Sequence, residues 1–175
     1  MSNNRNISTN NCKENEVSIL YAPWREAWVT RKDRTESSDC IFCTIPTQNK
    51  DEEQFVVKRY KHCILMLNRF PYAAGHLLVI PFKHGARLSD FEPEVLAEIM
   101  TVSTQTTIAL RKMLNPTGFN IGLNIGAGAS IPDHLHQHII PRWKTDISFL
   151  ELIAETTVIN INLQEFYINL KKALE

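Results

Sequence analysis

The sequence predicts an α+β fold with a mostly antiparallel, twisted sheet, and three observations lead to this expectation. Several short segments are rich in β-branched and aromatic residues or run continuously apolar, as strands do. Two longer segments, residues 93–114 and 158–174, repeat apolar residues at helical spacing. Strand-like and helix-like segments do not alternate strictly along the chain, which argues against a parallel sheet. A length of 175 residues suits one domain with a substantial core.

Four stretches before the histidine-rich region carry the strand predictions. Phe55–Arg59 and Lys61–Asn68 are dense in β-formers and predict a hairpin that turns near Tyr60. His76–Pro81 is a continuous apolar run, typical of a central strand covered on both faces. Phe119–Asn124 alternates apolar with small or polar residues, which predicts a fourth strand. The apolar positions of that alternation are Phe119, Ile121, Leu123 and Ile125.

The longer helix is expected to follow a capping signal. Ser89 and Glu92, three residues apart, resemble a capping box, and Pro93 suits a first helical turn. The helix should run to about Leu114 as the long central helix, and a C-terminal helix is expected from about Val158 to Leu174. The residues expected on the buried side of the first helix are Leu96, Ile99, Met100, Leu110 and Met113.

Charge and hydropathy limit the partners of the chain. The 19 Lys and Arg residues balance the 19 Asp and Glu residues, so overall charge predicts no binding to nucleic acid and no attachment to an anionic membrane. The longest apolar runs, Cys63–Leu67 and Leu77–Phe82, are too short to span a bilayer, and the polar N-terminus has no apolar signal core. We therefore expect a cytoplasmic protein.

Three parts of the chain differ in character. Residues 1–16 are rich in Asn and Ser and predict a disordered tail. Residues 17–39 form an N-terminal arm, in which a cluster of aromatic residues is expected to dock on the body of the domain or on a second copy. Residues 40–175 are expected to form the folded domain.

The segment His134–Trp143 holds three of the six histidines of the chain. In a strand, His134, His136 and His138 would stand in a row on one face, roughly 7 Å apart. Such a row suits a metal, a nucleophile or both. An isolated strand histidine is more often a hydrogen-bonded core residue, but three in register beside Gly126 and Gly128 favour a functional site.

Two further histidines are expected to have other roles. His76 follows a glycine at the head of a buried strand, which favours a structural hydrogen-bonding role over catalysis. His62 has no supporting context and is expected at the surface.

Several motifs together resemble the histidine triad superfamily of nucleotide hydrolases and transferases. They occur over residues 40–145 in the family's order and spacing: Cys40-x-x-Cys43, Gly75–Pro81, His84, Gly122–Asn124, and the three alternate histidines followed by two apolar residues. Leu20–Arg25 and Arg142–Trp143, with Asp146 and Phe149 beyond, resemble the branch that contains bacterial diadenosine tetraphosphate phosphorylases. The resemblance implies a single HIT-type domain and a homodimer. Aromatic residues that would suit a dimer contact are Trp24, Trp28 and Trp143.

The resemblance implies roles for the site residues. His136 would attack the α-phosphorus of a nucleotide to form a nucleotidyl-histidine, since a neutral imidazole is abundant near pH 7. His138 is placed to donate a hydrogen bond to a phosphate or leaving-group oxygen. Asn68 resembles the ribose-contacting position and Asn124 the phosphate-side amide of the family. The backbone amides of Gly126, Gly128 and Ser130 suit close approach to phosphates.

Cys40 and Cys43, with two distant histidines, are enough to close a tetrahedral metal site. The resemblance to metal-containing triad proteins assigns zinc to Cys40, Cys43, His84 and His134. With four protein ligands this zinc would be structural, tying the start of the domain to the catalytic segment. A pair of free cysteines and a redox-active Cys-x-x-Cys are the alternatives.

Two departures from the family pattern bear on the substrate. Ala129–Asp133 stands where many triad hydrolases have Gly-Gln-Ser or Gly-Gln-Thr, and Gln137 replaces an apolar residue inside the triad. Both favour an enzyme that splits dinucleoside polyphosphates, with phosphate or water as acceptor. The alternatives are a hydrolase of nucleoside phosphoramidates or adenylated amines and a nucleotide-binding module without turnover.

Overall fold

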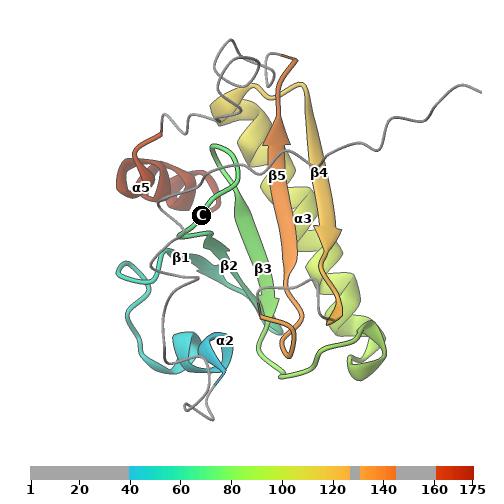
Figure 1. Cartoon of the computed structure of the whole chain (residues 1–175). Coiled ribbons are helices and arrows are strands. Elements are labelled where there is room, and N and C mark those ends of the chain that lie inside the picture. The colour runs from blue at the N-terminus through green and yellow to red at the C-terminus, as the bar shows by residue number, and fades with distance from the viewer. Residues whose placement is uncertain (1–39, 127–130, 145–160) are drawn as a thin grey trace, which may run out of the picture.

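A five-stranded antiparallel sheet forms the body of the protein in the computed structural model (Figure 1), which describes residues 40–126, 131–144 and 161–175. The strand order β1-β2-β3-β5-β4 confirms the predicted α+β fold. The strands are β1 (Val56–Arg59), β2 (Cys63–Leu67), β3 (Leu77–Pro81), β4 (Gly118–Leu123) and β5 (Gln137–Arg142). The helices are α2 (Ile41–Thr44), α3 (Pro93–Leu114) and α5 (Leu163–Ala173), with short 3-10 turns at Ile45–Thr47 and Leu88–Asp90.

Some of the predicted features lie outside the described residues. These are the tail and arm with Trp24 and Trp28, the loop residues Gly128 and Ser130, and the expected start of the last helix at Val158. Within the described part of the chain, no helix is long and apolar enough to span a membrane.

The predicted hairpin is present and is fastened to α3. β1 and β2 pair with Arg59 opposite Ile64, and the Tyr60 amide donates to the Cys63 carbonyl at 2.8 Å, so the turn lies where the sequence predicted it. The carboxylate of Glu98 in α3 accepts the backbone N–H of His62 at 2.6 Å and that of the preceding residue at 3.2 Å. The turn amides are therefore satisfied by a helix residue that is distant in sequence.

The sheet buries a different hydrophobic cluster on each face. Helices α3 and α5 cover one face, and the long α3 runs behind β4 and β5 in Figure 1. The short α2 and the turn after it cover part of the other face through Phe42 and Ile45. Because β3 is buried on both faces, all five of its residues are buried, as its apolar run predicted. The sheet residues packed on the α2 side are Val56, Ile64, Met66, Leu78 and Ile80.

The buried side of α3 differs in part from the expectation. Ile99 and Leu110 are buried as predicted, but Met100 is 55% exposed, so its placement in the core was wrong. Ser103 and Thr106 face the core instead, because their hydroxyl groups donate to the carbonyls of Ile99 and Val102 at 2.8 and 2.7 Å. A hydroxyl that makes a hydrogen bond can be buried at little cost. A prediction based only on apolar residues therefore misses Ser103 and Thr106. The other buried positions are Val95, Val102 and Ala109, while Leu96 and Met113 are partly buried.

The expected capping box is also absent from the start of α3. Glu92 is the N-cap, its side chain makes no capping bond, and Pro93 occupies the first turn as predicted. Asp90 instead accepts the backbone N–H groups of Ala86 and Arg87 at 3.0 and 2.9 Å. The acidic side chain therefore caps the 3-10 turn before the helix, and Ser89 lies within that turn.

Strand β4 was predicted correctly but is less buried than its pattern suggested. It lies at the end of the strand order, so only β5 pairs with it in the described sheet. Ile121 is 44% exposed and Ile125 is 50% exposed. Phe119 and Leu123 pack partly buried against the cluster on the α3 side, so the alternation marks that face but buries it only in part.

Substitutions at Ile99 and Met100 test which side of α3 is buried. Ile99→Ala should lower the free energy of unfolding by about 2–5 kcal/mol, because it empties a buried site. Met100→Ala should change it by no more than about 0.5 kcal/mol, as is usual for an exposed residue. Urea titration of both variants measures the difference. Equal losses from the two substitutions would contradict the observed orientation of the helix.

Candidate active site and metal centre

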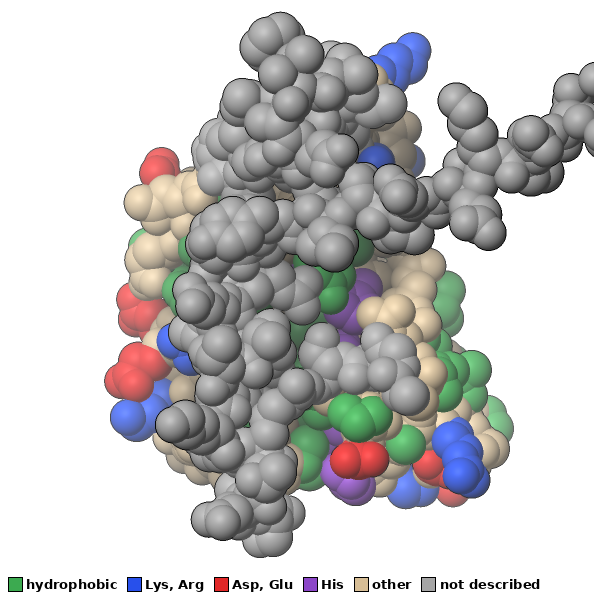
Figure 2. Space-filling view, in the orientation of Figure 1, with side chains coloured by type: hydrophobic (Ala, Val, Ile, Leu, Met, Phe, Trp, Pro, Cys, Tyr) green, Lys and Arg blue, Asp and Glu red, His purple; other side chains and the backbone are tan. Residues whose placement is uncertain are grey.

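The three histidines of the triad lie on one side of the chain, although they do not share one strand. β5 begins at Gln137, so His134 and His136 precede it, and the expectation of a single strand was wrong in this respect. The Phe42 ring contacts both of these imidazoles edge-on, at centroid distances of 5.6 and 5.0 Å. The rings of His136 and His138 are 5.0 Å apart. All three histidines are buried, and Figure 2 shows histidine atoms near the middle and at the lower edge of the viewed face.

His136 is held in one tautomer by its own segment. Its Nδ1 lies 2.8 Å from the carbonyl oxygen of His134, and a carbonyl can only accept, so Nδ1 carries the hydrogen. The other ring nitrogen, Nε2, therefore has its lone pair available. Burial lowers the pKa of His136, although the bond to the carbonyl acts in the opposite direction. The ring is thus a neutral base or nucleophile at neutral pH.

His138 is held in the opposite tautomer by a chain of hydrogen bonds. The backbone N–H of Tyr72 donates to Nδ1 of His76 at 3.1 Å, so the hydrogen of His76 is on Nε2. That Nε2 lies 2.8 Å from Nδ1 of His138, which must accept. The hydrogen of His138 is consequently on Nε2, the ring nitrogen that lies near the side chain of Asn124. The Tyr72 ring lies against both imidazoles, at centroid distances of 4.7 and 5.9 Å.

The two candidate nucleotide-binding asparagines flank this chain. Asn68 approaches Nδ1 of His76 at 3.3 Å with its amide, and its Oδ1 accepts from the Phe70 amide at 2.9 Å. The exposed Asn124 has its side-chain amide 3.4 Å from Nε2 of His138. Because that Nε2 carries the hydrogen, the bond requires Asn124 to turn its amide oxygen toward the ring. Asn68 therefore contacts His76, and Asn124 contacts His138.

Gln137 points away from the triad. Its side chain donates to the hydroxyl of Ser103 in α3 at 2.5 Å, and it is only 5% exposed. It pairs with Val79, on the face of the sheet that α3 covers. The residue that departs from the family pattern therefore ties β5 to α3.

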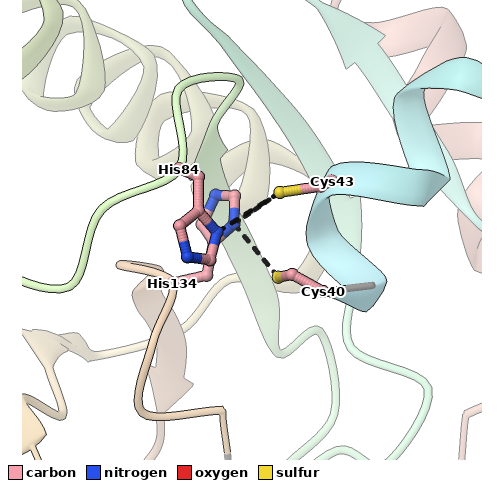
Figure 3. A group of neighbouring side chains, drawn as sticks. All are labelled: Cys40, Cys43, His84 and His134. Atoms are coloured by element: carbon pink, nitrogen blue, oxygen red, sulfur yellow. Dashed lines mark hydrogen bonds between the residues drawn. The ribbon is translucent and has the colours of Figure 1, made fainter. Parts of the chain in front are cut away.

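Four predicted metal ligands converge at the start of the domain (Figure 3). Their ligand atoms all lie within 4.8 Å of one another: Cys40 and Cys43 come from the start of α2, His84 from the loop after β3, and His134 from the segment before β5. Nδ1 of His134 is 3.3 Å from Sγ of Cys40 and 3.5 Å from Sγ of Cys43. Nδ1 of His84 is 3.3 Å from Sγ of Cys43.

The chemistry of this donor set fits a tetrahedral metal ion. Nε2 of His134 donates to the carbonyl of Pro81 at 2.9 Å, which leaves Nδ1 unprotonated on the side of the two thiols. A second hydrogen bond of this kind usually orients a metal-binding imidazole. Two sulfur and two nitrogen ligands at such spacing are the set preferred by zinc.

His134 links the group of four candidate metal ligands to the candidate nucleophile, His136. The ring of His134 belongs to the cluster, and its carbonyl oxygen accepts the hydrogen of His136. Any group that fixes the His134 ring therefore also fixes the atom that selects the tautomer of His136. The two residues, His134 and His136, are separated by one residue in the sequence.

This fold and this site define a class of protein, and comparison with known families names it. The family model described as "HIT domain" matches residues 49–145, more than half of the chain. The chain belongs to the HIT domain family.

Named relatives and solved structures agree with this family. The chain is 35% identical over 154 residues to a protein named AP-4-A phosphorylase from Mycobacterium tuberculosis, which covers 84% of this chain and 79% of the relative. It is 36% identical over 100 residues to an asymmetrical bis(5'-nucleosyl)-tetraphosphatase from Schizosaccharomyces pombe, covering 56% of this chain and 54% of the relative. A zinc-bound histidine triad family protein from Mycobacterium smegmatis has a similar structure, with a TM-score of 0.61 and 27% identity, covering 78% of this chain and 93% of the other.

The tertiary structure adds two aromatic residues to the site that sequence reasoning missed. Phe42 lies inside the Cys-x-x-Cys motif and packs on two triad histidines, and Tyr72 packs on His76 and His138. Phe42 stands between two of the candidate metal ligands, and this position was a usable signal. Tyr72 lies in a turn-rich connection and gave no such signal.

The hydrogen bonds predict which tautomer each imidazole adopts. His136 should carry its hydrogen on Nδ1 and His138 on Nε2, and long-range ¹⁵N–¹H spectra distinguish the two forms. His76→Phe removes the donor to Nδ1 of His138, so the His138 signals should change to a mixture of tautomers. The His136 signals should stay unchanged, because their partner is a backbone carbonyl. A single tautomer of His138 in the variant would contradict the proposed chain.

Proposed function

We propose that this protein is an enzyme that splits dinucleoside polyphosphates of the diadenosine tetraphosphate type through a nucleotidyl-histidine intermediate. The observation that carries the proposal is the pair of opposite tautomers at the site. His136 offers a lone pair at Nε2, and His138, with its ring 5.0 Å away, offers a hydrogen at Nε2. A nucleophile beside a proton donor is what displacement at phosphorus requires.

In the first step, Nε2 of His136 forms a bond to the α-phosphorus while the bond to the bridging oxygen of the leaving nucleotide breaks. His138 donates a hydrogen bond from Nε2 to that oxygen, which leaves as the anion of the nucleoside polyphosphate, and Nε2 of His76 holds the ring in line. In the second step, water or inorganic phosphate attacks the same phosphorus, the bond to Nε2 of His136 breaks so that His136 returns to its neutral form, and the proton of an attacking water passes to solvent. The products are a nucleoside monophosphate with water, or a nucleoside diphosphate with phosphate.

The remaining contacts to the nucleotide are proposals of the same kind. We assign the ribose to Asn68 and the α-phosphate to Asn124, which flank His76 and His138. Backbone amides at Gly128 and Ser130, outside the described residues, are assigned to the phosphates. The names of the two relatives, a phosphorylase of AP-4-A and a bis(5'-nucleosyl)-tetraphosphatase, support this substrate class.

Removal of the nucleophile tests the catalytic assignment. His136→Gly should reduce turnover of diadenosine tetraphosphate by at least about a thousandfold, the scale of loss when a catalytic nucleophile is removed. Its dissociation constant for AMP should change little, since the ring is small and its backbone contacts remain. Wild-type protein that has reacted with labelled diadenosine tetraphosphate should carry one labelled nucleotide per active chain. The reaction is stopped without acid, because acid cleaves a phosphorus–nitrogen bond. Unchanged turnover in the variant would remove His136 from the mechanism, and a bound nucleotide without any turnover would favour a binding module.

Product analysis tests the acceptor. Diadenosine tetraphosphate is incubated with and without inorganic phosphate. ATP and ADP formed only with phosphate identify a phosphorylase, whereas ATP and AMP, or two ADP, identify a hydrolase. Adenosine 5′-phosphoramidate as a parallel substrate tests the alternative, a phosphoramidate hydrolase. Faster turnover of the phosphoramidate than of the dinucleotide would favour that alternative.

We further propose that the metal cluster holds a structural zinc ion. Cys40, Cys43, His84 and His134 would be its ligands, and the zinc-bound relative from M. smegmatis supports this. When bound, zinc would supply no chemistry to the phosphate. It would fix the ring of His134, whose carbonyl orients His136. A reducing compartment keeps such thiols available, which agrees with a cytoplasmic location.

Metal analysis tests the zinc proposal. Protein purified without added metal should contain about one zinc ion per chain, the stoichiometry of a closed four-ligand site. Cys40→Ser should lose the zinc and lower the melting temperature, because metal binding contributes to folding. Cys63→Ser is a control at a buried cysteine outside the cluster and should keep the metal. Zinc-free wild-type protein of undiminished thermal stability would contradict the proposal.

We propose that two copies form a homodimer through β4, the last strand of the described sheet. β4 ends the sheet on one side and presents Ile121, which is 44% exposed. A second β4 could pair with this edge and cover that side chain. Ile121→Lys should therefore produce a monomer in light scattering of the gel-filtration peak, while Ile168→Lys, at an exposed position on α5, should leave the dimer intact. A dimer that survives Ile121→Lys would place the interface elsewhere.

A further inference from the structure

The peptide group that joins His134 to Leu135 selects the tautomer of His136. Its carbonyl accepts the Nδ1 hydrogen of His136 at 2.8 Å. The N–H of the same group, which belongs to Leu135, donates to the carbonyl oxygen of Gly85 at 2.7 Å. Because a peptide group is planar and trans, its C=O and N–H point in opposite directions. A partner that holds the N–H therefore also sets the direction of the C=O.

The next peptide group in this series of hydrogen bonds joins Gly85 to Ala86. Its carbonyl accepts the Leu135 N–H, and its own N–H, on Ala86, donates to Oδ2 of Asp90 at 3.0 Å. This group is planar as well, so its C=O and N–H also point in opposite directions. Three hydrogen bonds through two peptide groups therefore connect the carboxylate of Asp90 to Nδ1 of His136.

All donors in this series point toward Asp90, and the series ends at its carboxylate. Oδ2 of Asp90 also accepts the N–H of Arg87 at 2.9 Å. The bond from Arg87, together with that from Ala86, lowers the pKa of Asp90, so this group is charged at neutral pH. Peptide groups that are hydrogen-bonded in series polarise one another, which strengthens each bond. The negative charge of Asp90 therefore makes the His134 carbonyl a stronger acceptor for His136.

The loop that carries Gly85 packs tightly against the core. A Cβ built on Gly85 would lie 3.0 Å from the Cβ of Asp90 and 3.1 Å from the ring of Phe91. Phe91 is buried in the cluster that α3 covers. Figure 3 shows the loop with His84 beside the segment with His134, and these two imidazole rings are 5.2 Å apart. Glycine at position 85 lets the loop backbone approach the core this closely.

We propose that Asp90 is a positioning residue for the nucleophile, which holds the hydrogen of His136 on Nδ1 through two peptide groups and stabilises the ring when it becomes positively charged. The inference rests on the proposed function, because it concerns the nucleophile of that reaction. The imidazole of His136 gains a positive charge when its Nε2 bonds to phosphorus, since Nδ1 keeps its hydrogen. A stronger acceptor at Nδ1 stabilises this state. Asp90 would act without touching the substrate.

Replacement of Asp90 tests this connection. Asp90→Ala should lower kcat for diadenosine tetraphosphate by about threefold to tenfold, the scale of one weakened hydrogen bond, and should leave KM nearly unchanged. In NMR spectra of the free protein, the ¹H signal of Nδ1–H in His136 should move upfield, and the amide of Leu135 should exchange faster with deuterated water. A merely structural role would change stability without moving the His136 signal. An unchanged Nδ1–H signal in this variant would overturn the proposal.

Two further variants separate the hydrogen bond from net charge. Asp90→Asn keeps an acceptor oxygen without the charge, so its kcat and its Nδ1–H signal should lie between those of wild type and Asp90→Ala. Glu92→Ala removes the same charge two residues away, where the exposed side chain makes no capping hydrogen bond. Its kcat and its His136 signal should equal those of wild type. Equal effects of Glu92→Ala and Asp90→Ala would assign the result to overall charge and would also overturn the proposal.

Zinc analysis and NMR spectra distinguish failure of the inference from failure of the proposed function. Zinc is quantified in Asp90→Ala, because His84 lies in the same loop. A His136 signal that returns to its wild-type position when zinc is added would assign the change to the metal and overturn the proposal. If wild-type protein does not turn over the substrate, the proposed function is wrong, and the His136 signals of the same variants decide the inference. A shifted signal that added zinc does not restore supports it.

Discussion

The hydrogen bond from Nδ1 of His136 to the carbonyl of His134 is the interaction on which the site depends. A neutral imidazole has two tautomers of similar energy. Only the tautomer with its hydrogen on Nδ1 leaves a lone pair on Nε2. The backbone carbonyl of His134 selects this tautomer, and the side chain of His134 belongs to the Cys–His cluster. The ring of His134 is held in turn by the Pro81 carbonyl at the end of β3. The chemistry of His136 therefore depends on the packing of β3 against the segment before β5.

A second chain of hydrogen bonds fixes His138 from the other direction. His76, the second residue of this chain, directly follows Gly75, where the backbone lies close to α3 and α5. Gly75 has φ +74°, and a Cβ there would lie 2.8 Å from Leu114 of α3, so the backbone conformation and the space both require glycine. The Tyr72 amide then sets the tautomer of His76, and His76 sets that of His138. Each buried ring nitrogen in this chain has a partner, which keeps the cost of burying polar groups low.

The sheet supplies the frame that brings these two chains together. β3 and β5 pair with Leu78 opposite His138, which places the catalytic face on the side of α2 and the metal cluster. Gln137 and Ser103 tie the opposite face of β5 to α3, so the strand that presents His138 is anchored from behind. β4 adds Gly122 and Asn120 to the face that carries His138, and in the described part of the chain only β5 pairs with it. The pairing of β5 with β3 and β4 thus holds His138 within the sheet.

Local sequence patterns determined the kind and order of the elements, the turn at Tyr60, and the residues of the triad and the cysteine pair, because periodicity, turn residues and ligand types act over a few positions. Tertiary contacts decided the rest. Met100 is exposed because Ser103 and Thr106 satisfy their hydroxyls within α3 and take inward positions. Gln137 turns to Ser103, and Tyr72 reaches His138 through His76. These orientations depend on hydrogen bonds within a folded helix or between residues far apart in the chain. The polarity of a residue does not predict which partner it will bond.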